Sequence, residues 1–169
     1  DHRLGSSEAP PAIISVFLGN ELTAIYKALE DGTLYKDKKP TDLKIGAKVL
    51  PPLPQDTTDR NRTSPVAFTG NKFEFRMVGS ASSIADTNTT LNTAIAEVLK
   101  QFADELESSN DIDTDVISLI KRTVREHERI LFNGNNYSQE WVKEAKKRGL
   151  ANLKTAADAL PHMTDKKNV

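Results

Sequence analysis

The strongest constraint on the fold is a change of sequence pattern near residue 86. Before it, short apolar runs alternate with loops rich in proline and glycine. After it, apolar residues recur at steps of three and four, as in Leu91, Ile95, Leu99, Phe102 and Leu106. Such a stripe is typical of an amphipathic helix. The pattern therefore predicts an α+β chain in which β-strands come first and a helical segment follows.

The chain divides into three parts on this pattern. Residues 1–86 are expected to form a β-region, in which a helix and a proline-rich loop occupy about residues 16–59. Residues 87–163 are expected to be helical, and residues 164–169 form a polar tail with no reason to be ordered. The first residues, DHRLGSSEAPPAIIS, contain no initiator Met, and we expect them to lie inside a longer protein.

Turn and capping residues predict where several elements begin and end. The apolar run Ala12–Phe17 lies between two prolines and Gly19, which predicts a buried strand. Asn20 is expected to cap the following helix, which Gly32 ends. The sequence Thr69-Gly70-Asn71 predicts a hairpin turn between two strands.

The helical segment is predicted to hold three further helices. One runs from about residue 114 to 131, with Ile117, Ile120, Val124 and Leu131 facing inward. Ser138 is expected to cap the next helix, in which Trp141 is a core residue, and Pro161 is expected to stop a short last helix.

Composition excludes several classes of function. The net charge of −1 predicts no general attraction to nucleic acid or to anionic membranes. No apolar run is long enough to span a membrane. Cysteine is absent, which excludes disulfides, thiolate catalysis and cysteine-based zinc sites, and which fits the cytosol.

The strongest candidate for chemistry is the stretch FTGNKFEFR. Lys72, Glu74 and Arg76 alternate with Phe73 and Phe75, so a strand would carry charge on one face and aromatic rings on the other. The ordinary explanation is a solvated charged face with the rings packed behind it. The alternative is a site in which the carboxylate holds a divalent cation and the flanking cations hold carboxylate or phosphate oxygens. The alternation leaves both explanations open.

Three stretches, in this order, resemble glutamine synthetase. DHRLGSSEAPPAIIS is similar to the family segment Arg-Leu-Val-Pro-Gly-x-Glu-Ala-Pro. Residues 59–64 are similar to its Arg-Asn-Arg-Ser, and residues 72–76 to its Arg-x-Glu-x-Arg strand. FTGNKFEFRMVGS and NGNNYSQEW resemble the type III branch. The chain departs from the common pattern because residues 65–68 offer no second arginine and Lys72 replaces an arginine.

The resemblance implies the antiparallel β-strands of a glutamine synthetase-type catalytic funnel, followed by helices. It also implies ligation of ammonia to glutamate, driven by ATP and Mg²⁺ or Mn²⁺. Carried over by position, Glu74 would bind metal, Arg76 and Arg3 would bind glutamate, and Lys72 and Arg62 would bind ATP phosphates. Arg3, Arg62 and Glu8 would be catalytic, with Glu8 taking a proton from ammonium.

The expected partners are glutamate, ammonia, ATP and further copies of the chain, assembled into a ring-shaped homo-oligomer, a dodecamer in the intact cytoplasmic enzyme. Most of the family's metal ligands would lie upstream, so this chain alone is expected to be inactive. Two alternatives stay open at this point. One is a related ATP-dependent γ-glutamyl ligase that uses another amine, and the other is a helical assembly module without chemistry.

Overall fold

The computed structural model of the chain describes residues 13–35, 42–43, 53–54, 61–76 and 83–166. The described strands are β1 (Val16–Phe17), β2 (Asp42–Leu43), β3 (Leu53–Pro54), β4 (Val66–Phe68) and β5 (Phe73–Phe75). The described helices are α1 (Gly19–Asp31), α2 (Ala85–Leu106), α3 (Ile112–His127), α4 (Gln139–Lys147) and α5 (Ala156–Ala159), with two 3-10 helices, η1 (Glu128–Ile130) and η2 (Leu160–Thr164). The fold is thus mixed α and β, and the two longest described helices, α2 and α3, follow the change of pattern.

The main sheet has three strands in the order β1-β4-β5. The predicted hairpin is confirmed, because β4 and β5 pair antiparallel and Thr69 N donates to Lys72 O at 2.8 Å across the turn. The strand expected over residues 12–17 covers only its last two residues, and β1 pairs with β4 in parallel, not antiparallel as the family resemblance implies. A sheet this small defines no funnel, so the funnel stays a prediction.

Helix α1 is held at its first turn by a residue far away in the sequence. The prediction that Asn20 caps this helix is wrong, since the helix starts at Gly19 after Leu18. Instead, Asn133 Oδ1 accepts hydrogen bonds from the main-chain nitrogens of Leu18 and Gly19 at 3.0 and 3.2 Å. At the other end Gly32 adopts a positive φ of 66°, as expected for a glycine that ends a helix.

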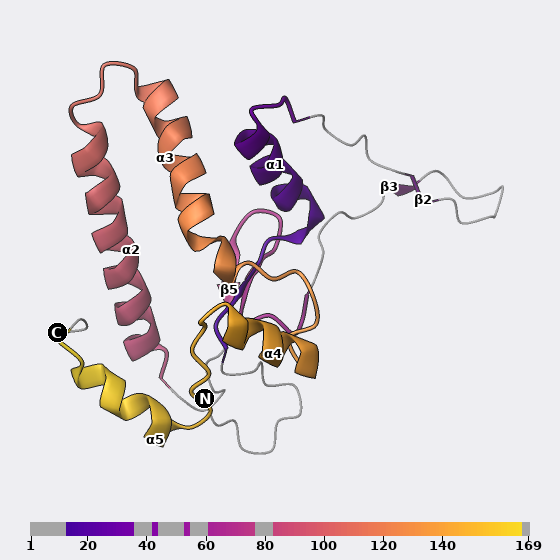
Figure 1. Ribbon diagram of the computed structural model, residues 1–169, viewed down its shortest axis with the longest axis vertical. Helices are drawn as coiled ribbons and strands as arrows, with labels where there is room; N and C mark the ends of the chain where they lie inside the picture. The colour runs from indigo at the N-terminus through magenta and orange to yellow at the C-terminus, as the bar shows by residue number, and fades with distance from the viewer. Residues whose placement is uncertain (1–12, 36–41, 44–52, 55–60, 77–82, 167–169) are drawn as a thin grey trace.

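Helices α2 and α3 form a long antiparallel hairpin, and α1 packs on α3 (Figure 1). The predicted stripe of α2 exists, but none of its residues is buried. The exposed apolar side chains of α2 are Leu91, Ile95, Val98 and Leu99, which we call the α2 apolar face. In α3, the prediction that Ile117 and Ile120 face inward is wrong, because both are exposed and Leu119 is buried in their place. The hairpin therefore has an apolar surface that this chain leaves largely uncovered.

A cluster of buried residues lies where α4 meets the segment that leads into β1. Trp141, Ile13 and Ala145 are each 1% exposed and form one cluster. The ring of Phe132 stacks on Trp141 with centroids 3.8 Å apart. Ser138 caps α4 as predicted, since its hydroxyl accepts a hydrogen bond from Trp141 N at 3.1 Å. The core thus gathers around a short helix and not around the longest ones.

The last helix is short, as predicted, but Pro161 does not stop the helical course of the chain. Helix α5 ends at Ala159, and Pro161 lies within the 3-10 helix η2 that continues the chain. Among the described residues, no helix is long and apolar enough to cross a bilayer.

Candidate active site

Two cations of the β5 region, Lys72 and Arg76, each contact the carboxylate of Glu74 on one side of the hairpin. Arg76 Nε and Nη2 donate hydrogen bonds to Glu74 Oε2 at 3.3 and 3.1 Å. Lys72 Nζ lies 3.7 Å from Glu74 Oε1 and forms an ion pair with the same carboxylate. The exposed fraction of the side chain falls from 63% at Lys72 to 40% at Glu74 and 23% at Arg76. The structure therefore brings the predicted row of charges together and shields it most at Arg76.

The register of the sheet shows which residues lie beside Glu74 on the same face. Glu74 pairs with Ala67, and Ala67 pairs with Phe17 on its other side. Directly paired residues lie on the same face, so Glu74 continues a row that starts with two fully buried side chains. The aromatic face is less covered than expected, since Phe73 is 53% exposed and contacts Phe68 at a centroid distance of 5.2 Å. Of the two faces, the charged one adjoins the buried row.

Arg76 is held at both its main chain and its side chain. Its main-chain nitrogen donates to Pro65 O at 2.8 Å, which extends the β4–β5 pairing by one step. Its Nη1 donates a hydrogen bond to the main-chain oxygen of Asn61. Arg62 follows Asn61 directly and is exposed, so the predicted phosphate-binding residue starts beside the guanidinium of Arg76.

Sequence reasoning missed the residues that support this turn. Asn61 Nδ2 donates to Gly134 O at 2.9 Å, and Asn61 Oδ1 accepts from Thr63 N and Ser64 N at 2.9 and 3.2 Å. Asn136 is fully buried and contacts the same turn, because its main-chain nitrogen donates to Thr63 Oγ1 at 3.0 Å. The available signal was the run FNGNNYS, in which three asparagines crowd around one glycine between two helices.

Two predicted catalytic residues, Arg3 and Glu8, lie outside the described residues. The same holds for Arg60, the first arginine of the stretch that resembles Arg-Asn-Arg-Ser. The structure therefore adds nothing on the roles predicted for Arg3 and Glu8.

Glu74 is the one predicted metal ligand, and its surroundings fit one ligand of a metal site that needs further ligands from elsewhere. Among the described residues, no group of three or more His, Cys, Asp or Glu side chains is arranged to hold an ion. One oxygen of Glu74 accepts the hydrogen bonds from Arg76, whereas the contact of the other oxygen within the described part of the chain is the longer ion pair with Lys72. That second oxygen suits a single contribution to a Mg²⁺ or Mn²⁺ site completed by other carboxylates.

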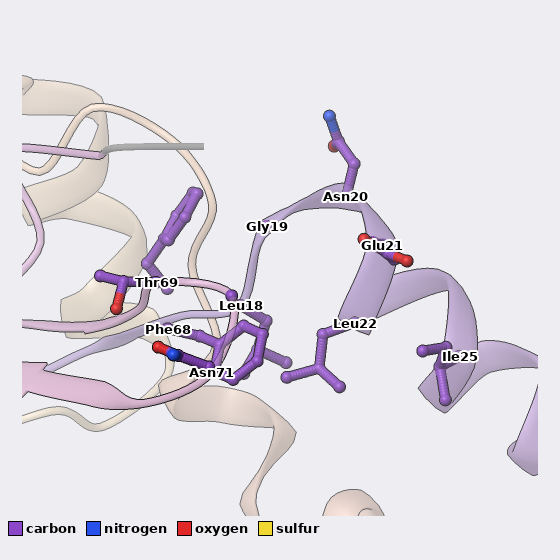
Figure 2. A pocket seen from close by; sticks show the side chains of 11 residues that line it. Leu18, Gly19, Asn20, Glu21, Leu22, Ile25, Phe68, Thr69 and Asn71 are labelled. Carbon is purple, nitrogen blue, oxygen red and sulfur yellow. The ribbon is translucent and has the colours of Figure 1, made fainter. Parts of the chain in front are cut away.

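A pocket of about 470 Å³ lies near the tip of the same hairpin, between the turn and the start of α1 (Figure 2). Its apolar lining includes Leu18, Leu22, Ile25 and Phe68, and its polar lining includes Asn71. Figure 2 shows Leu22 extending from α1 toward the side formed by Phe68 and Asn71. None of the charged residues discussed above lines this pocket.

Comparison with known proteins gives the class to which this chain belongs. The sequence model described as "Glutamine synthetase C-terminal domain" matches residues 115–169. The chain is 44% identical over 172 aligned positions, and along 100% of its length, to the type-3 glutamine synthetase of Dictyostelium discoideum. It is 43% identical to the glutamine synthetases of Bacteroides fragilis (strain YCH46) and Butyrivibrio fibrisolvens, along 97% and 96% of its length.

These matches show that the chain belongs to the glutamine synthetase family, and the resemblance predicted from three short motifs is confirmed. The match to the Dictyostelium protein, which runs along the whole chain, supports the type III branch. The chain spans about a quarter of the length of the curated relatives it matches: 23%, 24% and 23%.

Proposed function

We propose that this chain supplies part of the active site of an ATP-dependent glutamate–ammonia ligase. The observation that carries the proposal is the contact of Lys72, Glu74 and Arg76 on one side of the β4–β5 hairpin. It combines a carboxylate oxygen available to a metal with cations suited to carboxylate and phosphate groups. The relatives are named glutamine synthetases, which favours ammonia as the nucleophile over another amine.

The proposed reaction has two steps. A side-chain carboxylate oxygen of glutamate attacks the terminal phosphorus of ATP, and the bond to ADP breaks. Ammonia, formed when ammonium gives up a proton, then attacks the acyl carbon, and phosphate leaves with the carbon–oxygen bond electrons while a second proton departs from nitrogen. Both steps concentrate negative charge, so fixed cations stabilise them.

Each described residue has a role that its surroundings support. Arg76, shielded and fixed by Glu74 and Asn61, suits a planar contact with the glutamate substrate. Lys72 and Arg62 are exposed cations at the same hairpin and suit phosphate oxygens. Mg²⁺ or Mn²⁺, partly held by Glu74, would neutralise ATP phosphates. The proposal also includes Arg3, which would bind the glutamate substrate, and Glu8, which would accept a proton from ammonium.

Self-association into rings, dodecameric in the intact protein, belongs to the same proposal. The exposed α2 apolar face supports it, because apolar patches of this kind often mark protein contacts. A cytoplasmic location is also proposed, since the reaction consumes ATP. A purely assembling role for the helical segment would leave the charged hairpin unexplained.

The test is Glu74→Gln in the full-length protein, because glutamine keeps the shape of the side chain and removes its charge. We expect ATP-dependent γ-glutamyl transfer to be abolished while the assembly state, measured by light scattering, is unchanged. The matched control is Glu128→Gln at an exposed position of η1, which should keep wild-type turnover. Wild-type turnover of the Glu74→Gln protein would refute the metal role.

A further inference from the structure

One loop, residues 132–137 between η1 and α4, contacts the start of α1, the turn at residues 61–63 and the segment that leads into β1. Asn133 holds the start of α1, as described above. Gly134 O accepts the hydrogen bond from Asn61 Nδ2. Asn136 Nδ2 donates to Ser15 Oγ at 2.6 Å, just before β1, and both side chains are fully buried. We call this segment the asparagine loop.

A short path of hydrogen bonds leads from this loop to Arg76. The Asn61 side chain is fixed by Gly134 O on one side and by the amides of residues 63 and 64 on the other. Fixing this side chain fixes the adjoining peptide, whose oxygen accepts from Arg76 Nη1. The Thr63 hydroxyl joins the path, since it lies 2.7 Å from Asn61 Oδ1 and accepts from Asn136 N at 3.0 Å.

We propose that Asn61, Thr63 and Asn136 are positioning residues that set the orientation of the Arg76 guanidinium before glutamate binds. The inference rests on the proposed function, in which Arg76 holds the substrate. Glu74 accepts hydrogen bonds from one edge of the guanidinium, and the side chain of Glu74 is itself 40% exposed. The Asn61 carbonyl adds a second, independent anchor on another segment, and a preoriented group loses less freedom when substrate binds.

The buried polar groups explain why this path is sensitive. Asn136 and Ser15 are 0% exposed and hydrogen-bond to each other, so no water can replace a lost partner without rearrangement. A disturbance in the asparagine loop is therefore passed to Asn61 and not absorbed by solvent. The effect should be larger on glutamate binding than on ATP binding, because the path ends at the guanidinium of Arg76. Arg62 adjoins the path through the Asn61–Arg62 peptide, but its side chain is exposed.

The test uses Asn61→Asp in the full-length enzyme. Aspartate keeps the oxygen that accepts from residues 63 and 64, but it replaces the amide that donates to Gly134 O. We expect the KM for glutamate to rise by about tenfold, the scale of one lost hydrogen bond, while the KM for ATP stays within about twofold. The matched control is Asn135→Asp in the same loop, whose side-chain oxygen accepts only from Tyr137 N among the described contacts and should keep both constants.

A second pair of variants covers the case in which Asn61→Asp fails to fold. Thr63→Val removes the hydroxyl at constant shape and should raise the glutamate KM in the same selective way. Thr63→Ser restores the hydroxyl and should restore the KM. Equal changes in the glutamate and ATP constants, or none, would overturn the positioning role.

Arg76→Lys separates failure of this inference from failure of the proposed function. If Arg76→Lys leaves the glutamate KM unchanged, Arg76 does not hold the substrate and the proposed function is wrong at this residue. If Arg76→Lys raises the KM but the Asn61 and Thr63 variants do not, Arg76 keeps its role and the positioning path is refuted. If the proposed function and the positioning path both hold, the effects of Arg76→Lys and Asn61→Asp on the glutamate KM should be less than additive in the double variant.

Discussion

The asparagine loop and the α2–α3 hairpin differ in the relation between sequence polarity and burial. The loop is short and polar, yet Asn136 is fully buried and hydrogen-bonded to segments far away in sequence. The hairpin is long and amphipathic, yet the α2 apolar face is exposed and its link to α3 includes the exposed ion pair of Glu105 with Arg122. Apolar periodicity therefore marks which residues share a face, whereas burial depends on what the rest of the molecule places against that face.

The largest expected effect contrasts one core residue with one residue of the hairpin. Trp141→Ala should cost about 3–5 kcal/mol of unfolding free energy, because it leaves a cavity in the cluster of buried residues. Leu99→Ala, at a position that is 59% exposed, should cost no more than about 0.5 kcal/mol. Denaturant unfolding of the full-length protein measures both. Leu99→Ala should also weaken assembly in light scattering, because the α2 apolar face is part of the proposed contact between subunits. An equal loss of unfolding free energy in both variants would contradict the difference in burial between the core residue and the hairpin residue.

A smaller effect is expected at the start of α4. Ser138→Ala removes the side chain that accepts from Trp141 N, and this should lower the unfolding free energy by about 1 kcal/mol. Ser138→Asp, which can still accept this hydrogen bond, should recover most of the loss. An alanine variant as stable as the wild type would show that packing of Trp141 alone sets the start of the helix.

The smallest effect is a pH dependence confined to the hairpin. Hydrogen bonds from Arg122 at 2.8 and 2.6 Å lower the pKa of the Glu105 carboxyl from its ordinary value of 4.5. Because the folded pKa lies below the unfolded one, the pair stabilises the hairpin above pH 4.5 and loses this contribution as the pH falls through the folded pKa.

Hydrogen exchange of α2 and α3 at several pH values measures this contribution. Glu105→Gln should speed exchange slightly near neutral pH, and the difference from the wild type should vanish in acid. The control is Glu97→Gln on the same helix, whose partner Gln101 is neutral, and it should show no such pH dependence. A difference between Glu105→Gln and the wild type that grows in acid would contradict the sign of the shift.

The candidate site was partly predictable. Alternation within residues 72–76 was enough to place the three charges on one side of the strand, because side chains two apart share a face. The residues that anchor Arg76 were not predictable in this way. Asn61 and Gly134 are 73 residues apart, and Asn136 and Ser15 are 121 residues apart. No local pattern reports such a pairing.

Local chemistry in the sequence determined the turn at residues 69–71, the serine cap of α4, the end of α1 at Gly32 and the charge pattern of β5. The tertiary structure decided that Asn133 caps α1, that the α2 stripe stays exposed, and that Arg76 contacts both Glu74 and the carbonyl of Asn61. The physical reason is range: a turn, a cap or a periodic stripe depends on residues within a few positions, whereas burial and long-range hydrogen bonds depend on which distant segment packs nearby.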